Sequence, residues 1–264
     1  MAAFGAKDVQ ALRQSTGVGM LDAKKALEAN DGDVAAATKW LREKGLASAA
    51  KRTDRDASQG AVAVVRSGNA IAAVELRSET DFVAKSVDFI AKVNDMAAAV
   101  AAEGEGAISK FTEDVEQMLI TLKENISVGK VVRFEVADGQ AADAYLHSQD
   151  GRGVNAVLVV LNGGTEELAH DLAVHAAFTK PQYLSRDEVP ADEVAAERET
   201  IETISRNEGK PEASLEKVVE GRLNGWYKER CLLEQSYVRD EKQSIAQLLG
   251  SATVAHFAQI IIGA

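Results

Sequence analysis

Apolar residues recur at helical spacing in three short stretches near the start of the chain: residues 6–15, 20–29 and 34–44. Asp33 is placed to cap the third stretch, and Gly45 is expected to end it. These stretches predict a small three-helix bundle. Its core is expected to be thin, with Trp40 as the one large anchor.

The pattern then changes from helical to extended. Residues 51–60 have no apolar periodicity and are interpreted as a linker. Two alternating runs, residues 61–65 and 71–76, flank a Ser-Gly-Asn turn, which predicts a β-hairpin. Helix-rich stretches are expected at residues 80–102 and 111–124.

The second half repeats this order of strands followed by a helix. Strands are expected at residues 131–136, 144–147 and 154–161, the last being the clearest buried strand in the chain. Thr165 is placed to cap a helix that runs to about Phe178. Two apolar stripes around a Gly-Lys-Pro turn predict a helical hairpin, and the β-branched tail predicts a strand: residues 191–207, 213–233 and 254–262.

Charge limits the classes of function. The 264 residues include 41 acidic and 30 basic side chains, a net charge of −11, which argues against a free-standing nucleic-acid binder or a polybasic membrane anchor. The first 52 residues instead hold nine basic and six acidic side chains. No apolar run approaches the roughly 20 residues of a membrane span, and no leader pattern opens the chain. A cytoplasmic protein is therefore expected.

The residues offer no catalytic constellation. No phosphate-binding loop is present, and the four histidines lack the spacing of a metal site, so they are interpreted as structural. Cys231 is the single cysteine and lies on an apolar stripe, which is typical of an inert core thiol. We expect neither a metal nor a cofactor.

A polar and aromatic cluster stands at a strand-to-helix junction, residues 78–85. Thr80 is placed to cap the helix, and Asp81 suits its positive end. Phe82 then falls in the first turn. Two interpretations stay open: the ring packs into the core, or it is exposed as an interface hot spot.

Several runs resemble the elongation factor Ts family. Thr-Asp-Phe-Val-Ala-Lys at residues 80–85 is similar to one family signature, and residues 12–27, with Thr-Gly-Val-Gly-Met-Leu-Asp-Ala-Lys-Lys-Ala-Leu at their end, resemble the other. Shorter matches follow in the same order along the chain, at residues 123–126, 175–181, 219–222 and 247–249.

The resemblance implies an α+β fold. It comprises an N-terminal three-helix domain similar to ubiquitin-associated (UBA-like) domains, then a core of two α/β subdomains with small antiparallel sheets and an inserted antiparallel helical hairpin. Some family members carry a further C-terminal helical module, which we expect this chain to do without. The expected boundaries are 1–52 for the UBA-like domain, 53–60 for the linker, 61–140 and 141–264 for the two subdomains, and about 191–233 for the hairpin.

The resemblance also implies a function without covalent chemistry. Such a chain binds elongation factor Tu, a GTPase, in its GDP-bound and nucleotide-free forms and promotes exchange of GDP for GTP. Asp81 and Phe82, flanked by Thr80 and Val83, would disturb the Mg²⁺ and phosphate site of the partner. Met20 and Lys24 would contact its GTPase domain, and Leu122 and Lys123 would support that contact. His147 would face its third domain.

Purely structural explanations also fit three of these residues. Met20 fits the packing of a small bundle, Lys24 fits a solvated helix face, and His147 fits an ordinary strand end. An alternative function is an adaptor or chaperone-type module that binds proteins through residues 1–52 alone. A third hypothesis is an enzyme that uses His147, His170 or His175. The sequence leaves dimerisation of the free chain, through the hairpin, as an open question.

Overall fold

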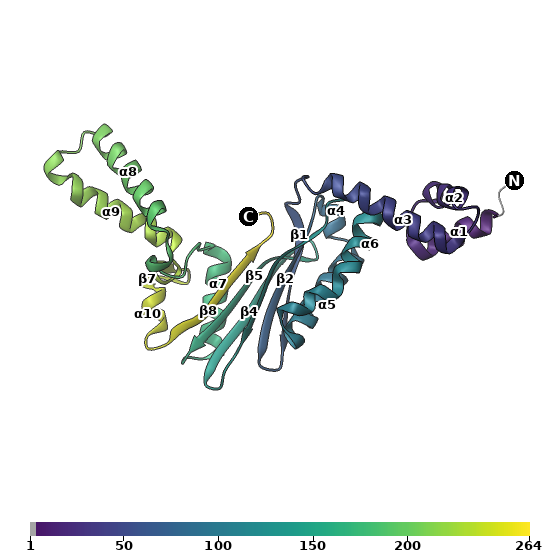
Figure 1. Cartoon of the computed structure of the whole chain (residues 1–264). Helices are drawn as coiled ribbons and strands as arrows, with labels where there is room; N and C mark the ends of the chain where they lie inside the picture. Colours follow the sequence, from purple (N-terminus) through teal and green to yellow (C-terminus); the bar gives the residue numbers. More distant parts are fainter. Residues whose placement is uncertain (1–3) are drawn as a thin grey trace. The chain divides into compact units, whose positions relative to one another are not determined.

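The computed structural model describes residues 4–264, and the expected α+β class is confirmed. Sequence-distant segments gather into two compact units, which are described separately. The first unit holds Met1–Arg133, Leu146–Ala156 and Ile260–Ala264, and the second holds Phe134–Tyr145 and Val157–Gln259. Figure 1 shows the order of the helices and strands along the chain.

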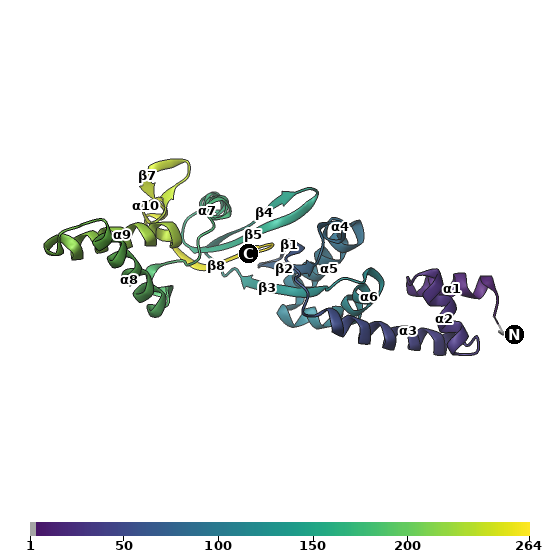
Figure 2. The same cartoon turned by 90° about the horizontal axis from the view of Figure 1, so that it is seen from above.

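The three predicted N-terminal helices are present as α1 (Ala6–Thr16), α2 (Met20–Ala29) and α3 (Val34–Ala49). Asp33 caps α3 as expected, because its Oδ1 accepts a hydrogen bond from the Ala36 amide at 3.0 Å. Figure 2 shows α3 running from this bundle toward α6 (Thr112–Leu122).

Two expectations about the bundle are wrong. Gly45 does not end α3, since the helix continues to Ala49; a Cβ at Gly45 would lie 2.6 Å from Cγ1 of Ile120, so the glycine allows α6 to pack closely. Trp40 is not the central anchor but lies half-buried at the edge of the cluster. The core is made by smaller residues such as Leu12 and Leu27, and Ile120 of α6 completes it.

The sheet of the first unit has the strand order β1-β2-β3, from β1 (Gln59–Ser67), β2 (Ala70–Ser78) and β3 (Ser127–Glu135). The predicted hairpin is confirmed. β1 and β2 pair antiparallel, with Gln59 opposite Ser78 at one end and Ser67 opposite Ala70 at the other. Helix α5 (Val87–Glu103) lies along β1 and β2 and buries one apolar face against them (Figure 1).

The helix-rich stretch expected over residues 80–102 is confirmed and consists of two helices, α4 (Asp81–Ala84) and α5. Two capping residues explain the break. Thr80 caps α4, as predicted, and Ser86 caps α5 by accepting a hydrogen bond from the Phe89 amide at 3.4 Å. Because a serine side chain in this position satisfies a free amide, a new helix begins where an apolar pattern alone shows continuity.

A second three-stranded sheet has the order β4-β5-β8, from β4 (Gln140–Gln149), β5 (Arg152–Asn162) and β8 (Thr253–Ile261). The buried strand and the strand in the tail are therefore confirmed. Helix α7 (Glu166–Thr179) begins at the Thr165 cap, as predicted. In the second unit, residues of β5, α7 and α10 (Ile245–Leu249) share one core cluster.

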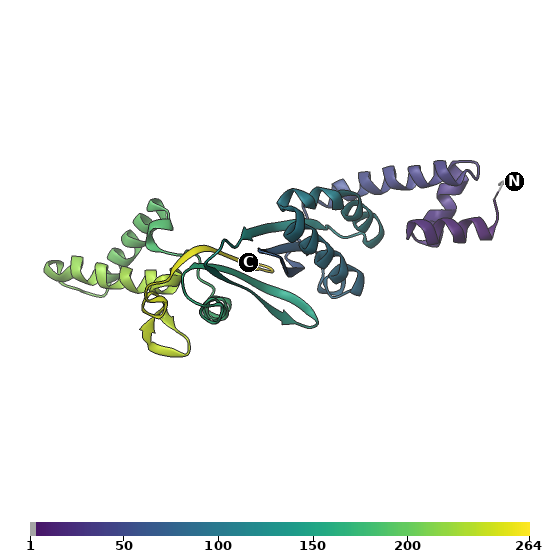
Figure 3. The same cartoon turned by 90° about the horizontal axis from the view of Figure 1, so that it is seen from below.

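The helical hairpin is confirmed as α8 (Ala191–Asn207) and α9 (Glu212–Arg230), drawn in green in Figure 3. Its second helix ends at Arg230 rather than at residue 233, because Tyr183 and the segment after Arg230 pair through backbone hydrogen bonds. The sequence pattern missed the short hairpin of β6 (Ser236–Tyr237) and β7 (Asp240–Ser244). The 3₁₀ turns are Ala50–Arg52, Glu105–Phe111, Arg186–Glu188 and Leu232–Glu234.

The contact at Gly45 yields a prediction about stability. An exposed helix interior gains about 0.5–1 kcal/mol when glycine becomes alanine. Gly45→Ala should instead destabilise the chain by about 1–3 kcal/mol, because the added methyl group overlaps Ile120. Urea unfolding followed by circular dichroism measures this change.

Gly221→Ala in α9 is the matched control, because no atom lies within 4 Å of a Cβ built there. It should be neutral or stabilising. Equal effects of the two substitutions would show that α6 does not press on Gly45.

Candidate partner-binding site

The junction of β2 and α4 places one aromatic ring in solvent. Thr80 caps α4 by accepting a hydrogen bond from the Val83 amide at 3.4 Å. Val83 and Ala84 turn inward onto the first unit's core, whereas Phe82 is 84% exposed. The ring therefore does not pack into the core, which decides between the two interpretations left open by the sequence.

A carboxylate from outside the junction fixes its backbone. Glu124 follows the end of α6 and accepts hydrogen bonds from the amides of Glu79 and Thr80, both at 3.1 Å. Its other oxygen accepts a hydrogen bond from the Thr80 hydroxyl. Bonds to a charged acceptor are stronger than neutral ones. Glu124 thus holds the residues directly before Phe82 in one conformation.

The neighbouring residues repeat this connection in the opposite direction. Glu79 Oε1 accepts a hydrogen bond from the Asn125 amide at 2.6 Å. The buried Asn125 side chain donates to the carbonyls of Thr53 and Arg55, at 3.2 and 2.8 Å. The junction, the end of α6 and the segment before β1 therefore form a single hydrogen-bonded network.

Charged side chains line the open depression beside Phe82. Lys85 Nζ lies 2.7 Å from Asp81 Oδ2 and 3.1 Å from Asp150 Oδ2. The hydrogen bond from Lys85 holds the pKa of Asp81 below its ordinary value, and the same bond raises the pKa of Lys85. Arg152 is buried nearby and donates to the Gly60 carbonyl and to Gln59. At neutral pH Asp81 is therefore ionised and oriented beside the exposed ring.

Four other predicted residues lie on α2 and at the end of α6, and an ion pair connects these two segments. Met20 and Lys24 are exposed on α2, and Lys24 pairs with Glu28 at 3.5 Å. Leu122 is 40% exposed at the end of α6, followed by Lys123. Lys123 Nζ lies 3.2 Å from Asp22 Oδ2, which connects α2 to the end of α6.

His147 stands apart from this network. It is exposed near the end of β4, and none of the hydrogen bonds or ion pairs of the junction within residues 4–264 includes it.

Sequence reasoning missed two exposed apolar side chains and one carboxylate. Val87, at the first position of α5, is 81% exposed, and Leu21 beside Met20 is 63% exposed. It also gave Glu124 no role, although the residue stands in the quoted match at residues 123–126. The signal that would have found it is an acidic residue directly after a helix, close to unpaired amides at a second helix start.

The histidines proposed for an enzyme do not meet. His175 is fully buried on α7, where Nε2 donates to Gln235 Oε1 at 2.9 Å and Nδ1 accepts from the Val238 amide at 3.3 Å. His170 is more exposed and pairs with Asp143 at 3.1 Å. Within residues 4–264, no group of three or more His, Cys, Asp or Glu side chains is arranged to hold a metal ion. Cys231 is buried, which raises the pKa of its thiol to about 11, as an inert core thiol requires.

The junction of β2 and α4 is thus a fixed corner that presents one exposed aromatic ring, which is typical of a protein that works by binding another protein. Comparison with known protein sequences identifies the family. A sequence model described as "Elongation factor TS" matches residues 79–264. The chain belongs to the elongation factor Ts family, and is thus a translation elongation factor.

Curated relatives agree over the whole length. The chain is 45% identical to "Elongation factor Ts" of Saccharopolyspora erythraea over 277 residues, covering 100% of this chain and 99% of the relative. It is 44% identical to the protein of that name from Kineococcus radiotolerans, covering all of both chains. The protein of Deinococcus deserti is 40% identical, with 98% of this chain and 99% of the relative covered. No helix in the described part of the chain is long and apolar enough to cross a membrane.

The Glu124 contacts generate a prediction. Glu124→Ala removes the acceptor of three hydrogen bonds and leaves the part-buried amides of Glu79 and Thr80 unpaired. We expect a loss of about 2–3 kcal/mol in the free energy of unfolding. Amide hydrogen exchange at residues 79–83 should also accelerate, since the junction opens locally.

Glu124→Gln is the conservative control. It should lower stability less and accelerate exchange less than Glu124→Ala, because one oxygen remains to accept. Unchanged exchange at residues 79–83 in Glu124→Ala would contradict the role of the carboxylate.

His175 generates a prediction about pH. Burial lowers its pKa below the ordinary value of 6.5, so the folded chain binds a proton there less readily than the unfolded chain. Stability is therefore expected to fall as pH drops below about 6.5, by at most about 1.4 kcal/mol per pH unit. Urea unfolding between pH 7.5 and 5.5 measures the slope.

His175→Asn should flatten that slope even if it lowers stability at every pH. His170→Asn, a substitution on the same helix, should leave the slope as it is. A slope that His175→Asn does not change would exclude His175 as its source.

Proposed function

We propose that this chain is a guanine-nucleotide exchange factor that binds GDP-bound elongation factor Tu and accelerates replacement of GDP by GTP. The observation that carries the proposal is the exposed ring of Phe82 on a corner fixed by Glu124. Membership of the elongation factor Ts family supplies the partner.

In the proposed mechanism Phe82 inserts between side chains of the partner near its magnesium and phosphate site. GDP is held there through its phosphates, and Mg²⁺ neutralises part of their charge. Asp81 enters the same region with Thr80 and Val83 behind it. Displacing the element that positions Mg²⁺ removes one source of nucleotide affinity, so GDP leaves faster without any covalent step.

The fixed corner matters for the energetics. Burying a phenylalanine ring contributes about 1.5–3 kcal/mol, and ordering a flexible segment on binding would consume part of that. Because Glu124 and Thr80 hold the backbone before binding, more of that free energy remains to disturb the nucleotide site. The coupling is reciprocal: if this chain weakens nucleotide binding, nucleotide weakens binding of this chain by the same factor, and GTP entry releases it.

The remaining predicted residues form secondary contacts in the same proposal. Met20 and Lys24 dock against the GTPase domain of the partner, and Leu122 and Lys123 support that contact. His147 faces the third domain of the partner. Neither nucleic acid nor a membrane takes part, and the reaction belongs in the cytoplasm.

One observation weighs against the adaptor alternative, in which residues 1–52 bind a protein alone. The core of the N-terminal helices includes Ile120 of α6, and Arg52 donates a hydrogen bond to the Leu119 carbonyl at 2.8 Å. An isolated N-terminal fragment would lose both contacts. The proposed function uses the bundle together with the rest of the first unit.

The test is release of a fluorescent GDP analogue from elongation factor Tu by catalytic amounts of this chain. Phe82→Ala should lower the catalysed rate by about tenfold or more, because the ring contributes about 1.5–3 kcal/mol only when it is bound. Its stability should be unchanged, since the ring is 84% exposed.

Phe178→Ala is the matched control: it is the same substitution at another exposed ring, 77% accessible on α7. It should accelerate GDP release from elongation factor Tu as much as the unmodified chain does. Undiminished acceleration by Phe82→Ala would show that another part of the surface causes exchange. No acceleration by the unmodified chain would contradict the proposed function.

A further inference from the structure

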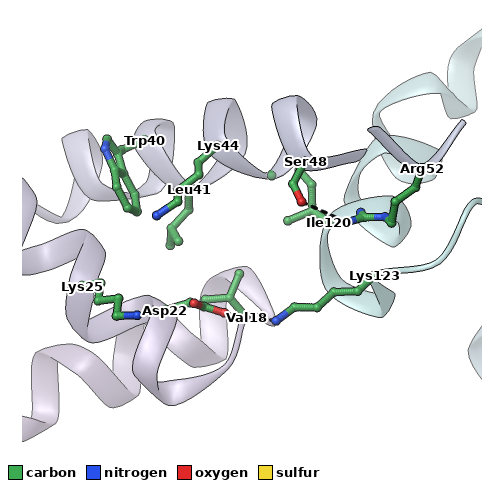
Figure 4. A pocket seen from close by; sticks show the side chains of 11 residues that line it. Val18, Asp22, Lys25, Trp40, Leu41, Lys44, Ser48, Arg52, Ile120 and Lys123 are labelled. Atoms are coloured by element: carbon green, nitrogen blue, oxygen red, sulfur yellow. Dashed lines mark hydrogen bonds and ion pairs between the residues drawn. The ribbon is translucent and has the colours of Figure 1, made fainter. Parts of the chain in front are cut away.

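A hollow in the first unit lies between α2, α3 and the end of α6, away from the exposed ring of Phe82. Figure 4 shows its lining: Val18, Leu41 and Ile120 form an apolar floor, and Trp40 stands at one end. Cationic side chains from three elements reach its rim. Of the residues that line the hollow, the proposed exchange mechanism uses only Lys123.

Arg52 closes the other end of the hollow and is unusual in its pairing. It is only 8% exposed; its Nη1 donates to Ser48 Oγ at 3.1 Å and its Nη2 to the Leu119 carbonyl at 2.8 Å. Its Nε is buried and has no acceptor, and no carboxylate in residues 4–264 forms an ion pair with it. A buried cation without a counter-ion is costly, so the site favours an added anion.

The lysines add to this imbalance. Lys25 forms no ion pair with a described carboxylate, and Lys44 lies over the face of Trp40, with Nζ 4.3 Å from the ring centroid. Lys123 is paired with Asp22, the single carboxylate of the lining. Four cationic side chains thus share one acidic side chain, in a chain whose net charge is −11.

We propose that this hollow binds the phosphate of a small phosphorylated molecule. Guanidinium and ammonium groups are the side chains that recognise phosphate, and here both kinds converge from separate elements. The phosphate would lie against Arg52, Lys44 and Lys123. The organic part would cover the apolar floor next to Trp40, a surface that inorganic phosphate alone would leave open to water.

The test is isothermal titration calorimetry of the full chain with inorganic phosphate, pyrophosphate and ADP, at constant ionic strength. Pyrophosphate and ADP should bind with one-to-one stoichiometry and a Kd below about 1 mM, and ADP should bind more tightly than pyrophosphate. Lys44→Gln and Lys123→Gln should each weaken binding about tenfold, as expected for loss of a charged contact. Both substitutions leave the buried residues in place, so the test does not depend on refolding a damaged core.

Lys39→Gln is the matched control, because Lys39 is on the same helix but outside the hollow, paired with Glu43 at 3.8 Å. Its affinity should stay within about twofold of the unmodified chain. Absence of binding by all three anions would overturn the proposal. So would equal weakening by Lys39→Gln and Lys44→Gln, which would show attraction to the net charge of the helix instead of a site. Equal affinity for pyrophosphate and ADP would overturn the role given to Trp40.

Discussion

The hydrogen bonds that Glu124 accepts hold the junction of β2 and α4, on which the exposed ring of Phe82 stands. A short helix such as α4 cannot hold its own start, since the first amides of any helix lack partners within it. Here the Thr80 side chain accepts from the Val83 amide, and Glu124 accepts from the amide of Thr80 and from that of Glu79 just before the helix. Together these bonds hold the strand-to-helix turn, and with it the exposed ring, in one conformation.

The same helix carries a second connection. Ile120 completes the core of the N-terminal helices, and Glu124, four residues further on, holds the corner that carries Phe82. Helix α6 therefore joins two surfaces that the proposed function requires at once. Its packing explains the glycine at position 45 of α3: a side chain there would push Ile120 away from the core of the bundle.

Most of the fold could be predicted from the sequence, because local periodicity determines most helices and strands. The hairpin around the Ser-Gly-Asn turn, the Thr165 cap and the paired helices α8 and α9 all follow from local patterns. The error at Gly45 arose because a distant residue decides a local outcome: Gly45 looks like a helix stop until Ile120 is beside it. Ser86 shows a local limit instead, since its cap divides an apolar stretch whose period alone does not mark the break.

The site shows the same division between local and distant information. Thr80 as a cap could be read from neighbouring residues, whereas composition alone favoured a buried Phe82. The two residues that follow it, Val83 and Ala84, pack against the core of the first unit, whereas the ring of Phe82 lies in solvent. An exposed aromatic side chain gains nothing for the fold of the free chain. The exposed ring on a junction fixed by Glu124 is the reason why we propose the exchange mechanism at this place.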